Sequence, residues 1–271
     1  MHIVKMHGCG NDYIVVEYEE GISYSNLSKK LCDRRLGVGA DGLIVAKRNP
    51  FDIEIYGSDG SDIPMSTNGI ICYAKYCLDK GYITKNKIDV ITDIGKIKVQ
   101  IENEDSFMAS INMGTPIYNN QSLFISDPLD SFGRILNIGD SNIISYSVFL
   151  GTVHTVIFVD DFDCNALRLA SEISNYRIFN RKTNVNFVKI IDCNNIEIRT
   201  YERGIGWVLS SGSGSCAAAA VANELELVDM RLMAHQEYGS YQIEINRKGE
   251  VYITGPSIKV FECDIKEEDL C

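Results

Sequence analysis

The sequence predicts an α/β protein made of two comparable halves. Segments rich in β-branched residues alternate with apolar helical segments in both halves, and a polar loop of small residues precedes an apolar helix in each half. The 271 residues are enough for two domains of about 130 residues, each able to bury its own core. We therefore expect the architecture to repeat, although the sequence itself does not.

In the first half, a helix is expected over 25–35, and strands over 1–5, 13–16, 43–47, 51–56 and 88–112. A glycine-rich loop over 57–61 and the segment Ser66-Thr67-Asn68-Gly69 precede an apolar helix over 70–78. The segment Gly114-Thr115-Pro116 then interrupts the strand pattern. It predicts a boundary between a first domain, 1–115, and a second domain, 116–256.

The second half follows the same plan. Strands are expected over 146–149, 155–159, 186–191 and 196–201, with a helix over 166–173. A second polar loop, from Ser210 to Ser215, precedes an alanine-rich helix over 216–227. A last strand over 258–263, within the segment 257–271, is expected to return to the first half.

Composition and charge exclude several classes of partner. The chain carries 26 basic and 37 acidic residues, a formal net charge of −11, and its longest basic runs are the pairs Lys29-Lys30 and Arg34-Arg35. Nucleic acids and anionic membranes are bound through clustered Lys and Arg, so neither is an expected partner. The longest apolar stretches contain polar residues and are too short to span a membrane. We expect a small molecule as the partner.

The cysteines indicate a reducing compartment. There are nine of them, at positions 9, 32, 72, 77, 164, 193, 216, 263 and 271, and no pair has the spacing CxxC. The four histidines are equally scattered, so neither a disulfide framework nor a zinc site is expected. No signal peptide is evident after Met1. These features favour a cytoplasmic protein.

The two polar loops are candidate anion sites. Backbone N–H groups at a helix N-terminus point outward and bind carboxylate or phosphate without a charged side chain, and small residues let the anion approach. Ordinary N-capping is the alternative for one loop alone, whereas two loops in matching positions favour a functional role. The loop over 210–215 lacks the Gly-Lys-Ser/Thr ending of a P-loop and the context of a dinucleotide fingerprint. Ser213 has no evident His or Asp to activate it, which argues against a serine hydrolase.

Several segments together resemble diaminopimelate epimerase and its relatives, the cofactor-independent amino-acid racemases. They occur in the order found in that family and cover nearly the whole chain: KMHGCGNDYIVVE (5–17), RRLGVGADGLI (34–44), YGSDGS (56–61), MSTNGIICYAKY (65–76), NMGTPIY (112–118) and YERGIGWVLSSGSGSCAAA (201–219).

The resemblance implies two pseudo-symmetric halves, each a twisted sheet wrapped around a central helix, with the active site in the cleft between them. It also implies a two-base mechanism in which one cysteine removes the α-proton and a second donates a proton to the opposite face. Two bases invert the carbon, whereas one base that returns its proton to the same face retains its configuration. Donors at the two helix N-termini would stabilise the carbanion-like transition state. No pyridoxal cofactor is expected.

The sequence departs from the family pattern at both catalytic positions, where serine replaces cysteine. The residues are Ser66 and Ser211. An alcohol is a far weaker acid than a thiol, and therefore supplies almost no base at neutral pH. We expect this chain to be nearly inactive, either as an engineered Cys→Ser variant or as a natural binding protein that has lost catalysis.

The remaining site residues follow from the same resemblance. Positions that match substrate contacts of the family are Asn11, Thr67, Asn68, Gly69, Asn184, Glu202, Arg203, Gly212 and Ser213. Of these, Asn68, Gly69, Gly212 and Ser213 are expected around the reacting carboxylate. Glu202 and Arg203 are expected near the amino group and the far end of the substrate, although a surface ion pair is the alternative without the motif.

The distal pocket argues against diaminopimelate. Two positions where the family usually has Asn are Gly57 and Thr152, so a second head group would lose partners worth about 1–3 kcal/mol each. Trp207 stands where the family commonly has Glu and is a candidate aromatic wall. We therefore expect histidine as the substrate. The alternatives are diaminopimelate itself, with Trp207 in the core, and a silent amino-acid-binding protein. A phenazine-type isomerase fits the loops less well, and a homodimer is left open.

Overall fold

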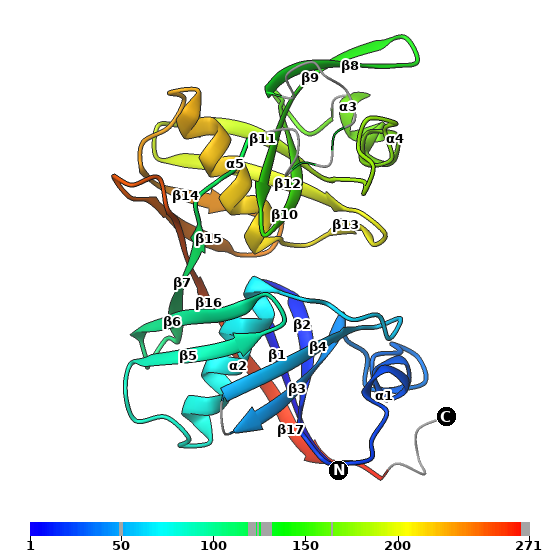
Figure 1. The fold of residues 1–271 in the computed structure, drawn as a ribbon, viewed down its shortest axis with the longest axis vertical. Coiled ribbons are helices and arrows are strands. Elements are labelled where there is room, and N and C mark those ends of the chain that lie inside the picture. The colour runs from blue at the N-terminus through cyan, green and yellow to red at the C-terminus, as the bar shows by residue number, and fades with distance from the viewer. Residues whose placement is uncertain (49–50, 119–122, 124, 126–131, 164, 267–271) are drawn as a thin grey trace. The chain divides into compact units, whose positions relative to one another are not determined.

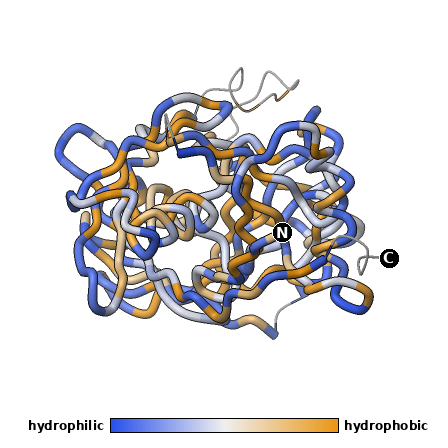
Figure 2. The backbone as a smooth tube through the Cα atoms, turned by 90° about the horizontal axis from the view of Figure 1, so that it is seen from below, coloured by the Kyte–Doolittle hydropathy of each residue, from blue (hydrophilic) through white to orange (hydrophobic). Residues whose placement is uncertain are grey.

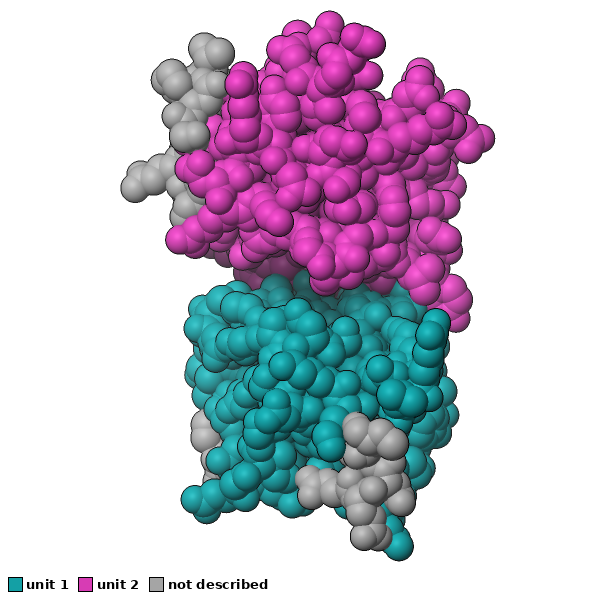
Figure 3. All heavy atoms as spheres, turned by 90° about the vertical axis from the view of Figure 1, so that its right-hand side faces the viewer, with its two compact units in different colours: residues 1–111, 254–271 teal, residues 112–253 magenta. Residues whose placement is uncertain are grey.

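The computed structural model describes the chain except for residues 49–50, 119–122, 124, 126–131, 164 and 267–271. Cys164, Cys271 and the end of the expected returning segment therefore lie outside the described residues. The chain divides into two compact units, unit 1 (residues 1–111 and 254–271) and unit 2 (residues 112–253), which Figure 3 shows in different colours. The boundaries fall inside two strands, β7 (Met108–Gly114) and β16 (Val251–Pro256), since both strands continue through them.

Unit 1 contains a sheet with a helix against it (Figure 1). Its strands, besides β7 and β16, are β1 (His2–Gly8), β2 (Asn11–Glu17), β3 (Gly42–Arg48), β4 (Phe51–Gly57), β5 (Lys87–Thr92), β6 (Gly95–Asn103) and β17 (Ile258–Asp264). The helix α2 (Thr67–Asp79) packs against β1, β2, β3 and β5, and most of its residues are buried. A second helix, α1 (Tyr24–Leu31), contacts β3 and β4.

Unit 2 has the same design. Its strands are β8 (Phe132–Ile138), β9 (Ser141–Leu150), β10 (Thr152–Phe158), β11 (Asn184–Asp192), β12 (Asn195–Glu202), β13 (Gly206–Val208), β14 (Arg231–His235) and β15 (Ser240–Ile245). The helix α5 (Gly212–Glu224) packs against β9, β10, β11, β12, β14 and β15 (Figure 1). The short helices α3 (Asn165–Arg168) and α4 (Ala170–Ser174) lie between β10 and β11 in the chain.

The strand pairings repeat between the units. Along unit 1, the pairs β1–β2, β2–β3, β3–β4, β4–β5 and β5–β6 alternate between antiparallel and parallel. The pairs β9–β10, β10–β11, β11–β12, β12–β14 and β14–β15 show the same alternation in unit 2. The central helix follows β4 in unit 1 and β12–β13 in unit 2. The predicted α/β class with two similar halves around central helices is confirmed.

The last strand, β17, returns to unit 1 as expected and pairs antiparallel with β1. In Figure 2, hydrophobic residues concentrate on the strands and central helices, while many of the connecting turns are hydrophilic. Small residues let α5 lie deep in its unit: its alanines from 217 to 219 are fully buried.

Four helices differ from the expected bounds for local reasons. α2 begins at Thr67 rather than residue 70, since the Ser66 side chain caps it. α1 ends at Leu31 rather than residue 35, because the Asp33 carboxylate accepts hydrogen bonds from the backbone N–H groups of Arg35 and Leu36, which favours a turn. The helix expected over 166–173 is two short helices, α3 and α4, separated at Leu169. α5 begins at Gly212 rather than residue 216, since the Ser211 side chain caps it.

Candidate active site

In unit 1, Ser66 is the N-cap of α2. Its backbone is extended, with φ −136° and ψ 122°, and its Oγ accepts a hydrogen bond from the Gly69 N–H at 3.2 Å. Thr67 and Asn68 follow in the first turn and are almost fully buried. The loop therefore presents backbone N–H groups at the positive end of a 13-residue helix.

In unit 2, Ser211 caps α5 with nearly the same geometry. Its φ is −139° and its ψ is 114°, and its Oγ accepts from the Gly214 N–H at 3.3 Å. Gly212 is buried and Ser213 is partly exposed in the first turn. The two serines thus occupy equivalent positions in the two units.

A chain of hydrogen bonds leads from Ser66 to Asn11. The Tyr13 hydroxyl donates to Asn11 Oδ1 at 2.8 Å and lies 2.7 Å from Ser66 Oγ. Because Tyr13 has a single hydroxyl hydrogen and gives it to Asn11, the Ser66 hydroxyl is the donor to Tyr13. Asn68 Nδ2 also donates to Asn11 Oδ1, at 3.3 Å. Asn11, Ser66 and Asn68 are therefore held together in unit 1.

The Asn11 side chain is bonded to a network of ion pairs. Asn11 Nδ2 donates to Asp41 Oδ2 at 2.8 Å, and Arg34 Nη2 lies 2.7 Å from both Asp41 Oδ1 and Asp12 Oδ1. Lys5 Nζ lies 2.6 Å from Asp12 Oδ2. Burial opposes ionisation of Asp12, but hydrogen bonds from Arg34 and Lys5 outweigh it and lower the pKa of Asp12 to about 2.

The Ser211 hydroxyl is hydrogen-bonded to a carboxylate, whereas the Ser66 hydroxyl is hydrogen-bonded to the phenol of Tyr13. Ser211 Oγ donates to Glu202 Oε1 at 2.8 Å. Behind the loop, Ser215 Oγ donates to the Ser211 carbonyl at 2.8 Å, and Gln236 Nε2 donates to Ser215 Oγ at 2.6 Å. These bonds fix the start of α5.

Arg203 is held by three groups of unit 2. Its backbone N–H donates to Asn184 Oδ1 at 3.1 Å, its Nη2 to Thr152 Oγ1 at 2.7 Å, and its Nη1 to the Arg181 carbonyl at 2.9 Å. Burial, followed by the nearby Arg181, lowers the pKa of Arg203. These hydrogen bonds bring Asn184, Thr152 and Arg203 together. Glu202 precedes Arg203 in the sequence and accepts a hydrogen bond from Ser211.

A buried histidine, His154, contacts Asn186, which in turn lies against Gly214 in the first turn of α5. His154 is fully buried, and burial followed by the charge of Arg203 lowers its pKa to about 3, so the imidazole is neutral. Asn186 Nδ2 lies 3.2 Å from His154 Nδ1, and Asn186 Oδ1 accepts from Thr200 Oγ1 at 3.0 Å. A Cβ at Gly214 would lie only 2.4 Å from Asn186 Oδ1, so this close approach requires glycine.

Comparison with known proteins now gives these features a context. A model of the diaminopimelate epimerase family matches residues 3–118 and 146–260. The chain belongs to the diaminopimelate epimerase family. A diaminopimelate epimerase of Caldanaerobacter subterraneus subsp. tengcongensis is 35% identical over 98% of this chain and 100% of its own length. Another from Alkaliphilus metalliredigens is 35% identical over 93% of each chain.

A solved structure agrees on the fold. A phenazine biosynthesis protein of the PhzF family from Bacillus anthracis superposes with a TM-score of 0.71, covering 98% of this chain and 99% of that one at 12% identity. At that identity the likeness is one of fold alone. The family match and the sequence relatives therefore show that this chain belongs to a family of isomerases, the racemases and epimerases.

The prediction that Trp207 forms an aromatic wall of the site is wrong. Strand pairing sets Trp207 opposite Tyr201 and Gly206 opposite Glu202. Successive side chains point to opposite faces of a strand, so Trp207 lies on the other face from Glu202. Its ring centroid is 5.6 Å from that of Tyr201 and 5.8 Å from that of Phe187. The indole therefore packs on this aromatic pair and does not line the site at Ser211.

The distal positions differ from the usual diaminopimelate epimerase pattern in two ways. At Gly57, a Cβ would lie 3.0 Å from Asp59 Oδ1 and 3.1 Å from Ser61 Oγ, so the turn leaves little room for a larger side chain. Thr152 places its hydroxyl on Arg203. Neither Gly57 nor Thr152 has a side-chain amide that could bind a substrate.

Neighbouring thiols do not substitute for the missing diaminopimelate epimerase cysteines. Cys72 in α2 and Cys216 in α5 are fully buried. Burial raises the pKa of Cys72 to about 12 and also raises that of Cys216. Such thiols hold almost no thiolate at neutral pH.

Three residues that contact the predicted site residues were not expected from the sequence: Tyr13, Asp41 and Asn186. One signal was available, because Tyr13 is two residues after Asn11 in a strand and shares its face. The contact of Asp41 with Asn11 and that of Asn186 with His154 depend on strand pairing, and a single sequence does not show it.

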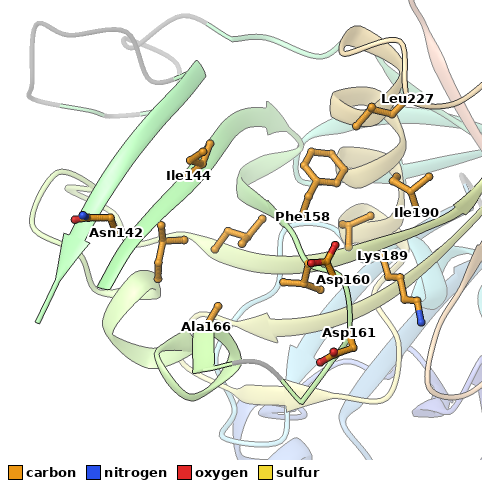
Figure 4. A pocket seen from close by; sticks show the side chains of 13 residues that line it. Asn142, Ile144, Phe158, Asp160, Asp161, Ala166, Lys189, Ile190 and Leu227 are labelled. Carbon is orange, nitrogen blue, oxygen red and sulfur yellow. The ribbon is translucent and has the colours of Figure 1, made fainter. Parts of the chain in front are cut away.

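A separate pocket of about 640 Å³ lies in unit 2 (Figure 4). Its lining residues include Ile144, Phe158, Asp160, Ile190 and Leu227. Leu227 follows the end of α5, whereas Ser211 caps its start, and none of the predicted site residues lines this pocket.

Two further observations concern the described residues. No group of three or more His, Cys, Asp or Glu side chains among them is placed to hold a metal ion. None of their helices combines the length and hydropathy needed to cross a membrane.

Proposed function

We propose that this protein binds a free amino acid at the loops that begin with Ser66 and Ser211, and that its racemase activity is close to the uncatalysed background. The observation that carries the proposal is the equivalent placement of the two serines as N-caps of the two central helices. Their loops keep the backbone donors that recognise a carboxylate. The thiols that would exchange the α-proton are absent.

The loss of activity follows from the chemistry of the alcohol. General acid–base catalysis requires a group whose pKa lies near the operating pH, and a serine hydroxyl is far from that range. Cys72 and Cys216 offer no replacement, because burial raises the pKa of both. Binding does not depend on the missing thiols, since helix N-terminal N–H groups carry it.

For the substrate we propose an amino acid with one head group, histidine being the specific candidate. The support is the pair Gly57 and Thr152, which offers no amide to a second head group, together with an Arg203 whose guanidinium already donates to Thr152 and to the Arg181 carbonyl. Trp207 no longer supports this choice. Diaminopimelate is the second candidate, favoured by the names of the sequence relatives.

The test uses the native chain and the double variant Ser66→Cys/Ser211→Cys. Each is incubated with L-histidine or LL-diaminopimelate, and the products are separated by chiral chromatography. We expect both proteins to bind histidine in calorimetry and only the double variant to invert it. Inversion by the native chain at a rate comparable to the double variant would contradict the loss of activity. Inversion of diaminopimelate but not histidine by the double variant would replace our substrate.

The natural or engineered origin of the two serines is tested by the genomic codons at positions 66 and 211. Serine codons support a natural amino-acid-binding protein, and cysteine codons indicate replacement. The cytoplasmic location and a homodimer stay predictions.

A further inference from the structure

A chain of hydrogen bonds links four strands of unit 2, β11, β12, β14 and β15 (Figure 1). His235 Nδ1 lies 2.9 Å from Ser240 Oγ, and His235 Nε2 lies 3.0 Å from Asn195 Oδ1. Asn195 Nδ2 in turn donates to Asp192 Oδ1 at 2.9 Å and to Asp192 Oδ2 at 3.1 Å. We call these residues the His235 cluster. None of them is among the predicted residues of the amino-acid site.

The donors and acceptors in the His235 cluster follow from its acidic end. Hydrogen bonds from the Asn195 side chain and from the Asn194 backbone lower the pKa of Asp192, so this group is a carboxylate and only accepts. Asn195 therefore directs its Nδ2 at Asp192 and its Oδ1 at His235. Because Oδ1 only accepts, the neutral imidazole has its hydrogen on Nε2 and a lone pair on Nδ1. The Ser240 hydroxyl donates its hydrogen to that lone pair.

We propose that Ser240 is a nucleophile with His235 as its general base, and that it hydrolyses small activated carboxylic esters. This activity is separate from the proposed amino-acid binding and does not depend on it. A nucleophile within hydrogen-bond distance of a base, with the base oriented by a third group, is the arrangement that activates serine for acyl transfer. Ser240, His235 and Asn195 take these three roles.

Strand pairing places the serine and the histidine side by side. His235 is opposite Ser240 in the antiparallel pair β14–β15, so their side chains share one face of the sheet. Their neighbours Ala234 and Tyr241 are fully buried on the other face, where α5 packs against both strands. His235 and Ser240 are only half-buried, so a small ester reaches them from solvent.

The surroundings favour both a charged base and an aryl ester. Glu197 pairs with His235 in the register of β12 and β14, and a carboxylate on the same face stabilises the imidazolium that forms when His235 takes a proton. The turn before Ser240 exposes Tyr238, whose backbone N–H donates to the carbonyl of the exposed Leu209 at 3.3 Å. These two side chains offer an apolar surface to the aromatic ring of a leaving group.

The atoms balance over two steps, with water as the second reactant. Ser240 Oγ forms a bond to the carbonyl carbon of the ester, and its hydrogen moves to His235 Nδ1. The bond from that carbon to the phenol oxygen then breaks, and the phenol leaves with the hydrogen from Nδ1. In the second step, water attacks the acyl-serine and gives one hydrogen to Nδ1. The carboxylic acid is released as Ser240 Oγ takes that hydrogen back.

The experiment uses the native chain and p-nitrophenyl acetate. Release of p-nitrophenol gives the rate, and mass spectrometry of peptides from acid-quenched samples locates the acetyl group. We expect the acetyl group on Ser240. Hydrolysis should be at least about 10-fold faster than by Ser240→Ala, a modest factor for general base catalysis, because the site is open to solvent.

Two further variants assign the other roles. His235→Gln keeps a polar side chain beside Ser240 but removes the base, so it should lower the rate of acetylation about 100-fold. Asn195 is a positioning residue, since it contacts the ring of His235 and not the ester. Asn195→Ala should therefore lower kcat about 10-fold and leave KM unchanged. The matched control is Ser110→Ala, the same change at a half-buried position of β7, which should leave the rate unchanged.

Circular dichroism shows which variants are folded, and each result has a distinct meaning. Acetylation confined to other residues, or hydrolysis unchanged in Ser240→Ala, would overturn the proposal. A rate that survives His235→Gln would exclude His235 as the base, and an unchanged kcat in Asn195→Ala would exclude its positioning role.

A second variant keeps the test decisive if Ser240→Ala does not fold. Ser240→Cys has a nucleophile of similar size, so the acetyl group should then be found on the sulfur at position 240, and its absence there would overturn the proposal. Histidine binding by the native chain is measured separately by calorimetry. A failure of ester hydrolysis therefore leaves the proposed function standing, and a failure of histidine binding leaves this inference standing.

Discussion

Gly214→Ala should destabilise this protein far more than Gly69→Ala, although both glycines occupy the same position relative to a serine N-cap. A Cβ at Gly214 would lie 2.4 Å from Asn186 Oδ1, and Asn186 cannot move without weakening its buried bonds to His154 and Thr200. Overpacking costs about 1–3 kcal/mol, and a weakened buried hydrogen bond costs about 1–3 kcal/mol. Against this, alanine favours a helix over glycine by about 1 kcal/mol. We expect a net loss of about 1–5 kcal/mol.

At Gly69, the nearest atom to a new Cβ is the terminal methyl carbon of Ile55, at 3.1 Å. The end of a flexible side chain yields more easily than an amide fixed by two bonds, so the helix propensity offsets the contact to within about 1 kcal/mol. This variant is therefore the matched control for Gly214→Ala.

The assay is urea-induced unfolding followed by circular dichroism, with the fluorescence of Trp207, the single tryptophan, reporting on unit 2. Adding Asn186→Ala to Gly214→Ala should make the joint loss smaller than the sum of the two single losses. Equal losses for Gly214→Ala and Gly69→Ala, or strict additivity in the double variant, would refute the reasoning.

Three further outcomes are expected. The pKa of Asp12 falls from 3.8 to about 2 on folding, so its carboxylate stabilises the fold above pH 4 and this stability is lost as the pH falls toward 2. Screening by water around the exposed Arg34 reduces the effect to about 1–2 kcal/mol, and Asp12→Asn should flatten the dependence of unfolding free energy on pH over that range. Thr152→Asn should raise the affinity for diaminopimelate relative to histidine, since it places a side-chain amide beside Arg203. Calorimetry with both ligands measures the ratio of the two affinities. An unchanged ratio would show that position 152 lies outside the pocket. Tyr13→Phe should lower the free energy of unfolding by about 1–2 kcal/mol, because it removes a hydroxyl bonded on both sides, and a loss within experimental error would contradict this.

Local chemistry made most of the fold predictable. Alternating β-branched residues gave the strands, and the small polar residues before α2 and α5 indicated where two helix N-termini would bind an anion. The exact helix starts were not predicted: the sequence put them at residues 70 and 216, whereas the Ser66 and Ser211 caps start α2 at Thr67 and α5 at Gly212.

Other features depend on pairing between distant segments and therefore escaped the sequence. Trp207 looked like part of the pocket because it follows Glu202 and Arg203 closely in the chain. The register of β12 with β13 instead sets it on the opposite face from Glu202. The shorter α1 shows the reverse case, in which a local side chain, Asp33, competes with the helix and the periodicity of apolar residues does not reveal it.

The pairing of β17 with β1 also bears on how the chain is synthesised. His2 pairs with Asp264, so the first strand of unit 1 gains this neighbour only after residues 258–264 have left the ribosome. Unit 2 is continuous in sequence and has all of its strands earlier. Domains generally fold as soon as their residues emerge, and long-range strand pairing is slow. The second unit is thus expected to fold before the first is complete, and nascent chains stopped before residue 258 should contain a protease-resistant unit 2 and a protease-sensitive unit 1.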